Sequence, residues 1–381
     1  MQKINDDQKY QLAFNHFQKI GPVKIRLLEN YFSDLKSAFY ASSIDLEKSG
    51  LSSKLTAEFI NWRKNFNLEE ALQELEKENI DIITWRDQEY PALLLEIHSP
   101  PPVLYYKGNI NILNSSVNCL AIVGSREHSA YANKVVSELI PALIENRIVI
   151  VSGLAYGVDT LAHQEALLNN GLTIAVLGCG LRKDKIYPYS NKVLAEKIIK
   201  NNGLLLSEFP PQTSPLKTNF PQRNRIIAGL CQATLVVESR EKSGSLITAY
   251  QALEQNREVL AIPGNIFSEF SRGPNGLIKK GAKLILDYED ILEVFNLSTA
   301  ITKNKKGNIN KINNQKELLL ETELEKTIYS LIKTALERGE KISADEIIKI
   351  SKLDTARINS TLSILEIKDL VKNEFGSYCL I

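Results

Sequence analysis

Short, wholly apolar runs recur along the middle of this chain at intervals of about 25–30 residues. Each run is only a few residues long and rich in β-branched side chains, which is typical of strands buried on both faces of a parallel sheet. The intervals are long enough for helical crossovers, so the spacing indicates repeated βαβ units. We therefore predict an α/β fold with a doubly wound, mostly parallel sheet, whose strands cover Leu120–Val123, Ile148–Val151, Ile174–Leu177, Leu204–Leu206, Thr234–Val237, Val259–Ile262 and Leu284–Leu286.

A chain of 381 residues exceeds one ordinary domain, so we expect smaller domains on both sides of an extended Rossmann-like domain over 79–296. Residues 1–78 have helical spacing and only two glycines, Gly21 and Gly50, each at a predicted turn between helices. This pattern fits a helix-hairpin-helix or SAM-like domain, whose turn amides face a phosphate. A helical bundle used only for packing fits it equally well.

Residues 297–316 have low complexity and few large apolar groups, which predicts a flexible linker. The last segment, 317–381, is predicted to form helices over Leu318–Glu337, Ala344–Ser351 and Thr355–Lys368, followed by a hairpin over Leu370–Leu380. Three helices and a hairpin of this size indicate a winged-helix domain. Because its third helix offers few cations, a protein-contact role is a slightly better interpretation than DNA binding.

The composition excludes several classes of protein. No stretch approaches the ~20 apolar residues that a membrane helix needs, and no apolar signal segment opens the sequence, so we expect a cytoplasmic protein without membrane contact. The four cysteines form no CxxC pair and the four histidines are scattered, which predicts neither a disulfide framework nor a metal site. A net charge of +1 means that any anion-binding surface must come from local clustering.

Glycines, serines and cations follow the predicted strands. Because ligands of open parallel sheets bind beyond the carboxyl ends of the strands, these loops are the expected binding site. Several cations there, together with Arg240 and Arg272, predict a basic stripe that binds phosphates; scattered ion pairs on a solvated surface are the alternative. The candidate site residues are Gly124, Ser125, Arg126, Ser152, Gly153, Lys217, Phe220, Arg223, Asn224, Arg225, Lys242, Ser243, Gly244 and Ser245.

Two features argue against nucleotide cofactors. Arg126 stands where the second glycine of a GxGxxG loop would allow a pyrophosphate to approach, and no acidic residue ends the second strand to hold a ribose. The guanidinium of Arg126 is instead suited to grip a phosphate. No GxxxxGK[ST] loop occurs either, so we predict no cofactor.

Phe220 lies between Lys217 and Arg223 in sequence, so a nucleic-acid base could stack on its ring between two phosphate contacts. Packing in the core beside Pro221 is the alternative. We favour stacking because the flanking residues are polar.

The motifs at these positions resemble those of the DNA-processing protein A family, also called Smf. The resemblance covers about Tyr90 to Ile291 and rests on YPALLLEIHSPPPVLYYKGN, GSREHSAYA, SGLAYGVDTLAH, TIAVLGCGL, FPQRNRIIAGL, SGSLITA and PGNIFSEFSRGPNGLIKKGA, in the family's order. One departure is the loop Leu181–Asp184, which has two more residues before its aspartate than the family's usual pattern.

The resemblance implies a protein without catalytic activity that binds single-stranded DNA, protects incoming DNA and loads the recombinase RecA in natural transformation. It also implies a homodimer formed through the Rossmann-like domain. By resemblance, Gly124, Ser125 and Arg126 fall on the phosphate-binding loop, Lys217, Phe220 and Arg223 fall on the DNA-contacting segment, and Ser243, Gly244 and Ser245 match a neighbouring helix start.

Two other functions fit part of the sequence. A nucleotide phosphoribohydrolase also places glycine-rich loops over a phosphate, but its PGGxGT run is replaced by Pro263–Phe267. A scaffold could recruit a recombinase without contacting DNA. Release of free base from AMP would identify the first, and failure to bind poly-dT would identify the second.

Overall fold

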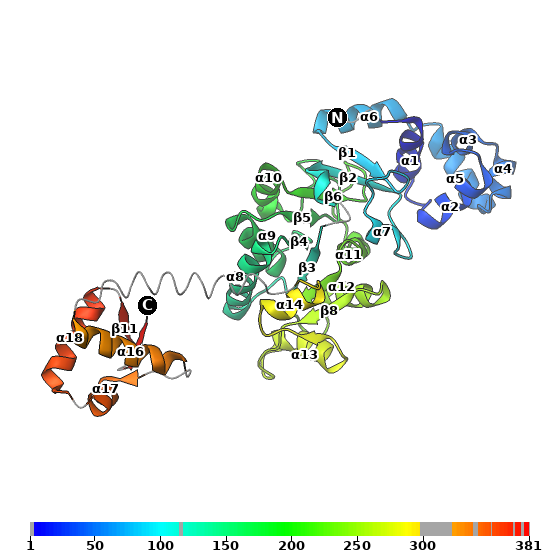
Figure 1. Ribbon diagram of the computed structural model, residues 1–381. Helices are drawn as coiled ribbons and strands as arrows, with labels where there is room; N and C mark the ends of the chain where they lie inside the picture. The colour runs from blue at the N-terminus through cyan, green and yellow to red at the C-terminus, as the bar shows by residue number, and fades with distance from the viewer. Residues whose placement is uncertain are drawn as a thin grey trace. The chain divides into compact units, whose positions relative to one another are not determined.

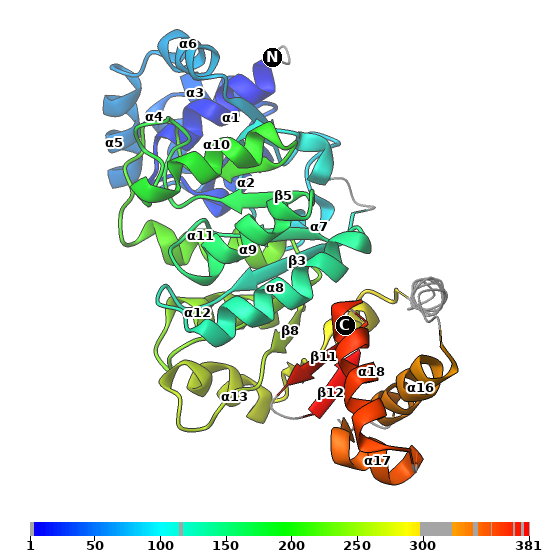
Figure 2. The ribbon, with the colours of Figure 1, turned by 90° about the vertical axis from the view of Figure 1, so that its left-hand side faces the viewer.

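A nine-stranded sheet forms the centre of the residues that the structure describes (Figures 1 and 2). The structure is a computed structural model, and it describes residues 4–113, 117–297, 322–337, 342–351, 353–368, 370–374 and 377–380. The strand order is β1-β2-β6-β5-β4-β3-β7-β8-β9. The strands are β1 (Asp81–Thr84), β2 (Val103–Gly108), β3 (Cys119–Val123), β4 (Val149–Ser152), β5 (Thr173–Val176), β6 (Leu204–Ser207), β7 (Ala233–Val236), β8 (Glu258–Ala261) and β9 (Lys283–Leu284).

The strands from β6 to β9 in this order pair in parallel, which confirms the predicted α/β fold with a mostly parallel sheet. Each predicted strand overlaps an observed one. The sheet also has an antiparallel edge that the apolar runs did not predict, in which β2 pairs with β6 and β1 pairs with β2. β2 ends in Lys107 and Gly108, so it lacks the uninterrupted apolar run of the central strands.

Alternate residues of the central strands enter two different hydrophobic cores, as the pleat requires. In β3, Leu120 and Ile122 pack in the core beneath α8, α9 and α14, whereas Ala121 and Val123 pack in the core beneath α11 and α12. Helices therefore cover both faces of the sheet (Figure 2). One face carries α8 (Ala130–Glu145), α9 (Val158–Leu168), α10 (Lys192–Lys200) and α14 (Tyr288–Val294), and the other carries α7 (Ala92–Leu95), α11 (Asn219–Gly229), α12 (Gly244–Glu254) and α13 (Arg272–Lys279).

The strand order reverses at β3, which lies between β4 and β7. The chain leaves β3 toward α8 on one face and leaves β7 toward α12 on the other. The loops after these two strands therefore diverge and open a crevice at the carboxyl edge, which is where open α/β sheets bind ligands.

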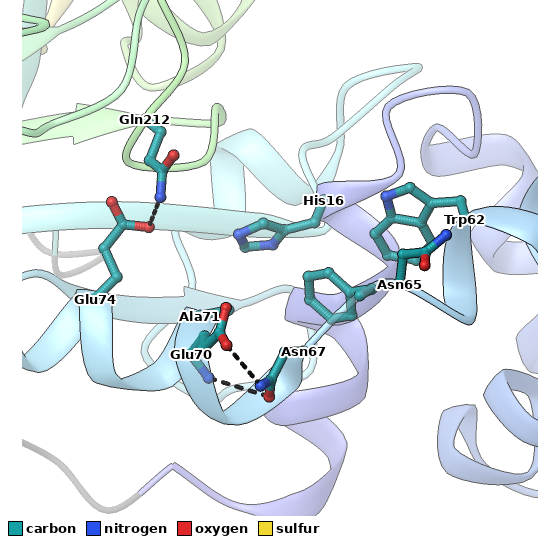
Figure 3. A pocket seen from close by; sticks show the side chains of 9 residues that line it. His16, Trp62, Asn65, Asn67, Glu70, Ala71, Glu74 and Gln212 are labelled. Atoms are coloured by element: carbon teal, nitrogen blue, oxygen red, sulfur yellow. Dashed lines mark hydrogen bonds between the residues drawn. The ribbon is translucent and has the colours of Figure 1, made fainter.

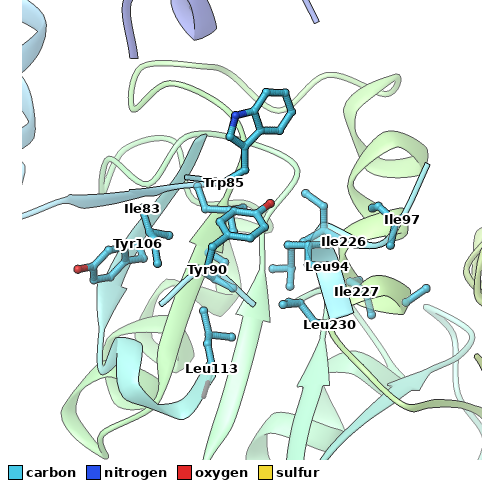
Figure 4. Packing of buried hydrophobic residues seen from close by; sticks show 14 of the residues in the cluster. Ile83, Trp85, Tyr90, Leu94, Ile97, Tyr106, Leu113, Ile226, Ile227 and Leu230 are labelled. Carbon is cyan, nitrogen blue, oxygen red and sulfur yellow. The ribbon is translucent and has the colours of Figure 1, made fainter. Parts of the chain in front are cut away.

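The segment around α7 packs against the side of α11 that faces away from the sheet. Figure 4 shows Tyr90, Leu94 and Ile97 packed with Ile226 and Ile227 of α11. The hydroxyl of Tyr90 donates to the Pro101 carbonyl oxygen at 2.8 Å, which fixes the segment's own turn. Because α11 is buried on both sides, the residues at its N-terminal end are held in place.

Six helices cover residues 6–78 and share a core of aromatic rings. Pro22 opens α2, and Gly50 has φ +102° between α4 and α5, so both predicted turns are present. The core continues into the sheet, because Leu12 and Leu75 pack with Tyr105 of β2. The predicted domain boundary at residue 78 stays a prediction. The helices are α1 (Asp6–His16), α2 (Pro22–Tyr31), α3 (Leu35–Tyr40), α4 (Ser43–Lys48), α5 (Ser53–Arg63) and α6 (Leu68–Glu78).

A second compact unit lies within 298–381. Its helices pack around Ile328, Ile332 and Leu362 beside a three-stranded antiparallel sheet of order β10-β12-β11. The predicted linker, apart from Leu297, and Phe375 and Gly376 of the predicted hairpin turn lie outside the described residues. The elements are α16 (Glu323–Glu337), β10 (Ile342–Ser343), α17 (Ala344–Ser351), α18 (Thr355–Ile367), β11 (Val371–Glu374) and β12 (Ser377–Leu380).

Candidate functional site

A pocket of about 600 Å³ lies at the carboxyl edge of the sheet, where the strand order reverses. Its walls come from the loops after β3, β4, β5, β6 and β7 and from the first turns of α11 and α12. Most of the predicted site residues line it. They are Gly124, Ser125, Arg126, Lys217, Phe220, Arg223, Asn224, Lys242, Ser243, Gly244 and Ser245.

Phe220 forms an aromatic surface in this pocket. It is the second residue of α11, and its partly buried ring lies against Gly178 in the loop after β5. A Cβ at Gly178 would come within 2.8 Å of the ring, so only glycine allows this approach. The ring of Tyr187 lies beside it, with centroids 5.8 Å apart and an interplanar angle of 51°. The two rings offer a planar group a place to stack.

Three exposed cations line the same pocket as the rings. Arg126, Lys217 and Lys242 line the pocket, and none of them has an ion-pair partner among the described residues. The guanidinium carbon of Arg126 lies 5.8 Å from the centre of the Phe220 ring. By contrast, Arg240 pairs with Glu127 at 2.9 Å and with Glu269 at 3.6 Å. Free cations attract anions more strongly than paired ones, so these three define the basic side of the pocket.

The start of α12 presents an ordered row of hydroxyl groups. Ser239 Oγ donates to the Arg240 carbonyl oxygen at 2.9 Å, and Ser245 Oγ donates to Ser239 Oγ at 3.0 Å. The 2.9 Å contact between Ser243 Oγ and Ser245 Oγ therefore has Ser243 as the donor. Ser243 caps α12 by accepting from the Ser245 amide. The positive end of this helix faces the same pocket as the free cations.

Arg223 lies beneath the pocket and is almost fully buried. Its guanidinium donates to the carbonyl oxygens of Gly153, at 2.7 Å, and of Val176, and its Nε donates to Asn224 Oδ1 at 3.2 Å. Burial lowers the pKa of Arg223 to about 10, against the opposing effect of Asp159. Arg223 therefore ties the ends of β4 and β5 to α11 and positions the first turn of that helix.

Asp159 balances the charge of Arg223 in the same buried region. Its carboxylate accepts from the amides of Gly153, at 3.1 Å, and Ala155, at 3.3 Å. Burial raises the pKa of Asp159, whereas Arg223 and the backbone amides oppose the rise. A charged pair held by this many hydrogen bonds fixes the loop after β4.

Three predicted site residues do not line the pocket. Ser152 is fully buried and donates to the Ile122 carbonyl oxygen at 2.7 Å. Gly153 faces inward, and a Cβ there would come within 2.6 Å of the Arg223 guanidinium. Arg225 points away on α11 and binds the buried carboxylate of Glu208 at 2.6 Å. Burial raises the pKa of Glu208, and Arg225 opposes this. These residues support the fold around the pocket.

Tyr187 belongs to this site but was not among the residues predicted from sequence. It is 40% exposed and lines the pocket beside Phe220. Its position in the loop after the third predicted strand was the available signal, because loops that follow the strands of such a sheet carry binding residues of every type, aromatic rings included.

The described residues offer no metal centre and no membrane span. They contain no group of three or more His, Cys, Asp or Glu side chains placed to share a metal ion. No helix within the described ranges combines the length and apolar character needed to cross a bilayer.

The fold and this pocket define the class of protein: a doubly wound α/β protein with a basic, aromatic pocket at the point where its strand order reverses. Residues 81–296 match the family described as DNA recombination-mediator protein A, and the chain belongs to that family. The predicted family is therefore confirmed.

Relatives of known name match over most of the chain. It is 36% identical over 395 residues to "Protein Smf" of Synechocystis, covering 98% of each chain. It is 46% identical over 230 residues to "DNA processing protein DprA" of Streptococcus pneumoniae, covering 60% of this chain and 79% of that one.

The similar solved structures include two DNA processing proteins. The crystal structure of DNA processing protein A from Streptococcus pneumoniae has a TM-score of 0.65 and 39% identity, covering 76% of this chain and 98% of that one. A structure of DNA processing protein A from Helicobacter pylori, described for its single-stranded DNA binding mode, has a TM-score of 0.50 and 30% identity, covering 56% of this chain and 95% of that one.

Proposed function

We propose that this protein binds single-stranded DNA in the pocket at the carboxyl edge of its sheet and acts without catalysis in homologous recombination. The observation that carries the proposal is the combination of Arg126, Lys217 and Lys242, free of ion pairs among the described residues, with the rings of Phe220 and Tyr187. Single-strand binding sites combine such backbone-gripping cations with rings on which bases stack.

The geometry favours a single strand over a duplex. A base reaches the Phe220 ring only when it is unstacked from its neighbours, because the ring lies inside the pocket beside Tyr187. In a duplex both faces of each base are already covered. Phosphates then have Arg126 and the start of α12 as contacts. The single-stranded DNA binding mode described for the Helicobacter pylori relative is consistent with this interpretation.

A direct test measures the binding of labelled oligo-dT and of a duplex of equal length by fluorescence anisotropy at moderate salt. The proposal expects clearly tighter binding of the single strand. Equal affinity for both would contradict it, and failure to bind oligo-dT would favour the scaffold. Incubation with AMP completes the test, because release of free base would favour a phosphoribohydrolase.

We further propose a homodimer through the Rossmann-like domain. Support comes from large apolar side chains exposed near the β9 edge: Ile266 (74%), Phe267 (87%) and Leu286 (76%). Exposed apolar groups of this size are typical of interaction surfaces. Light scattering should give the mass of a dimer for the wild type and of a monomer for Leu286→Lys. A wild-type monomer would overturn the proposal.

RecA is the proposed partner, on the strength of the family resemblance. The expected activity is faster assembly of RecA on oligo-dT that is coated with a single-strand binding protein. An assembly rate of RecA equal to that measured without this protein would contradict the proposal.

The winged-helix assignment of the second unit is also a proposal. It is supported by the element order of one helix, a short strand, two helices and a hairpin, with the strand paired to the hairpin. The assignment of 1–78 as a helix-hairpin-helix domain is supported by the glycine turns at Gly21 and Gly50.

A further inference from the structure

A second pocket, of about 380 Å³, lies between the N-terminal helices and the loop after β6 (Figure 3). Its lining includes His16 at the end of α1, Trp62 at the end of α5, Phe66 between α5 and α6, Glu70 and Glu74 on α6, and Gln212. These elements belong to the same compact unit as the sheet. None of the residues takes part in the DNA site proposed above.

One side of this pocket is aromatic. The rings of Trp62 and Phe66 stack with centroids 4.5 Å apart and an interplanar angle of 24°, and the His16 ring lies 5.3 Å from Phe66. Trp62 also stacks on Phe59, with centroids 5.9 Å apart and an interplanar angle of 28°, so its two faces are covered by Phe59 and Phe66. The ring of Phe66 is therefore the aromatic contact for a ligand, and such a ring attracts cations through its quadrupole, planar guanidinium groups that can stack among them.

The pocket also offers hydrogen-bond acceptors. The Nδ1–H of His16 donates to the Leu12 carbonyl oxygen at 2.9 Å, which leaves Nε2 as an acceptor. Burial lowers the pKa of His16, so the ring is neutral near pH 7. Glu70 and Glu74 add two carboxylates, and no lysine or arginine lines the pocket.

Both carboxylates are held in position. Glu70 accepts from the Asn67 side chain at 2.9 Å, and Glu74 accepts from Gln212 at 2.7 Å (Figure 3). Glu74 also accepts from Arg182, which lies outside the pocket lining, at 3.4 Å. Each carboxylate oxygen accepts more than one hydrogen bond, so these contacts leave acceptor capacity for a ligand. A donor-rich ligand therefore meets acceptors that are already oriented.

We infer that this pocket binds a guanidinium group, supplied either by an arginine side chain of a partner protein or by free arginine. A guanidinium is planar, cationic and composed only of donors, so it matches the aromatic ring and the acceptors at once. The chain itself places guanidinium groups against aromatic rings: the guanidinium carbon of Arg63 lies 5.7 Å from the Phe59 ring centre, and that of Arg26 lies 5.3 Å from the Trp85 ring centre.

The test is calorimetric titration of the full-length protein with N-acetyl-arginine amide, with the citrulline analogue as a neutral probe of the same shape. We expect saturable binding of the arginine probe and none of citrulline. Free arginine and a glycine-flanked arginine peptide, titrated in parallel, distinguish a small-molecule ligand from a protein partner by which of the two binds more tightly. Absence of saturable binding by every arginine probe, or equal binding of citrulline, overturns the inference.

Two variants of α6 localise the site. Glu70→Gln removes an exposed carboxylate that lines the pocket, whereas Glu69→Gln removes the adjacent exposed carboxylate, which does not. Loss of a charge-assisted hydrogen bond should weaken arginine binding roughly tenfold in Glu70→Gln. Binding should be unchanged in Glu69→Gln. Equal weakening in both variants would mean that only general charge attracts the probe, and it would overturn the inference. Neither variant removes a buried group, so both should fold.

Discussion

The guanidinium of Arg126 lies over the ring of Phe220, with its carbon 5.8 Å from the ring centre. Arg126 comes from the loop after β3 and Phe220 from the first turn of α11, so the contact joins two neighbouring walls of the pocket. From the sequence, a phosphate contact at Arg126 and a stacking ring at Phe220 were predicted as separate features. In the structure they form one surface, and a nucleotide that contacts either residue also meets the other.

Arg126→Ala should weaken oligo-dT binding most at low salt. Because it removes a cation that has no ion-pair partner among the described residues, the slope of log affinity against log salt should fall by about 0.7 for each phosphate that is no longer neutralised. Anisotropy titrations at several salt concentrations measure the slope. Arg272→Ala is the matched control, since Arg272 is exposed at the start of α13 and does not line the pocket. If the salt slope falls equally in Arg126→Ala and Arg272→Ala, Arg126 makes no specific contact with a phosphate.

Phe220→Ala should cost about 1–3 kcal/mol of binding free energy and leave the salt slope unchanged, because stacking releases no counterions. The same titrations measure both quantities, and thermal melting checks that the variant is folded. Since Arg126 contacts the ring, the double variant should lose less than the sum of the single losses. If Phe220→Ala reduces the slope of log affinity against log salt, or unfolds the protein, Phe220 does not act by stacking on a base.

The periodicity of the apolar runs was sufficient to predict the central strands, because strands buried on both faces are apolar at every position. The same rule could not find β1 and β2, which form the antiparallel edge and carry residues such as Asp81 and Lys107. Their place depends on pairing with β6, which no local pattern encodes.

The site could be predicted less completely than the sheet. Helical spacing places Phe220, Arg223 and Asn224 on one face of α11 and Arg225 on another. The sequence was therefore sufficient to predict that Arg225 points away from the other three residues. The burial of Arg223 could not be predicted from sequence, because it depends on carbonyl groups at the ends of β4 and β5 that meet only in the folded sheet. A cation in a basic motif therefore had two possible roles, and only the structure separates them.

Arg223→Ala should destabilise the fold. It leaves the carbonyl groups of Gly153 and Val176 unpaired and the buried Asp159 without its balancing charge, which should lower the free energy of unfolding by about 3–5 kcal/mol. Urea denaturation measures this value. Lys217→Ala, at an exposed position, should change it by less than about 0.5 kcal/mol. A stable Arg223→Ala variant with a reduced salt slope would instead make Arg223 a DNA contact.

Truncation after Lys305 should leave oligo-dT binding and its salt slope unchanged. The removed part includes the second compact unit, whose third helix region offers Arg357 and Lys368 as cations, and Lys368 binds the buried carboxylate of Glu325 at 3.1 Å. The pocket with its three free cations lies in the other unit. A large loss of affinity in anisotropy titrations would move the DNA site to the C-terminal unit.

His163 should make the fold less stable as the pH falls below neutral. Its ring is fully buried; Nδ1 lies 2.7 Å from the Thr173 hydroxyl, which itself donates to the Ile150 carbonyl oxygen. The Nδ1–H therefore donates to Thr173, and the buried Nε2 has no partner among the described residues. Burial, with a smaller effect from Arg223, lowers the pKa of His163 to about 3.

In the unfolded chain His163 titrates near its ordinary pKa of 6.5, so between 6.5 and about 3 the unfolded state binds a proton that the folded state does not. Stability therefore falls with decreasing pH across this window, by about 2 kcal/mol between pH 7 and pH 5 from this residue alone. The variant His163→Gln keeps a donor for Thr173. Its free energy of unfolding, measured by urea denaturation at pH 7 and pH 5, should change between these pH values by about 2 kcal/mol less than that of the wild type. Other titrating groups, His16 among them, are present in both proteins and cancel in the difference. Identical pH dependence in wild type and variant would mean that His163 becomes protonated in the folded protein, and that its ring is not sealed from solvent.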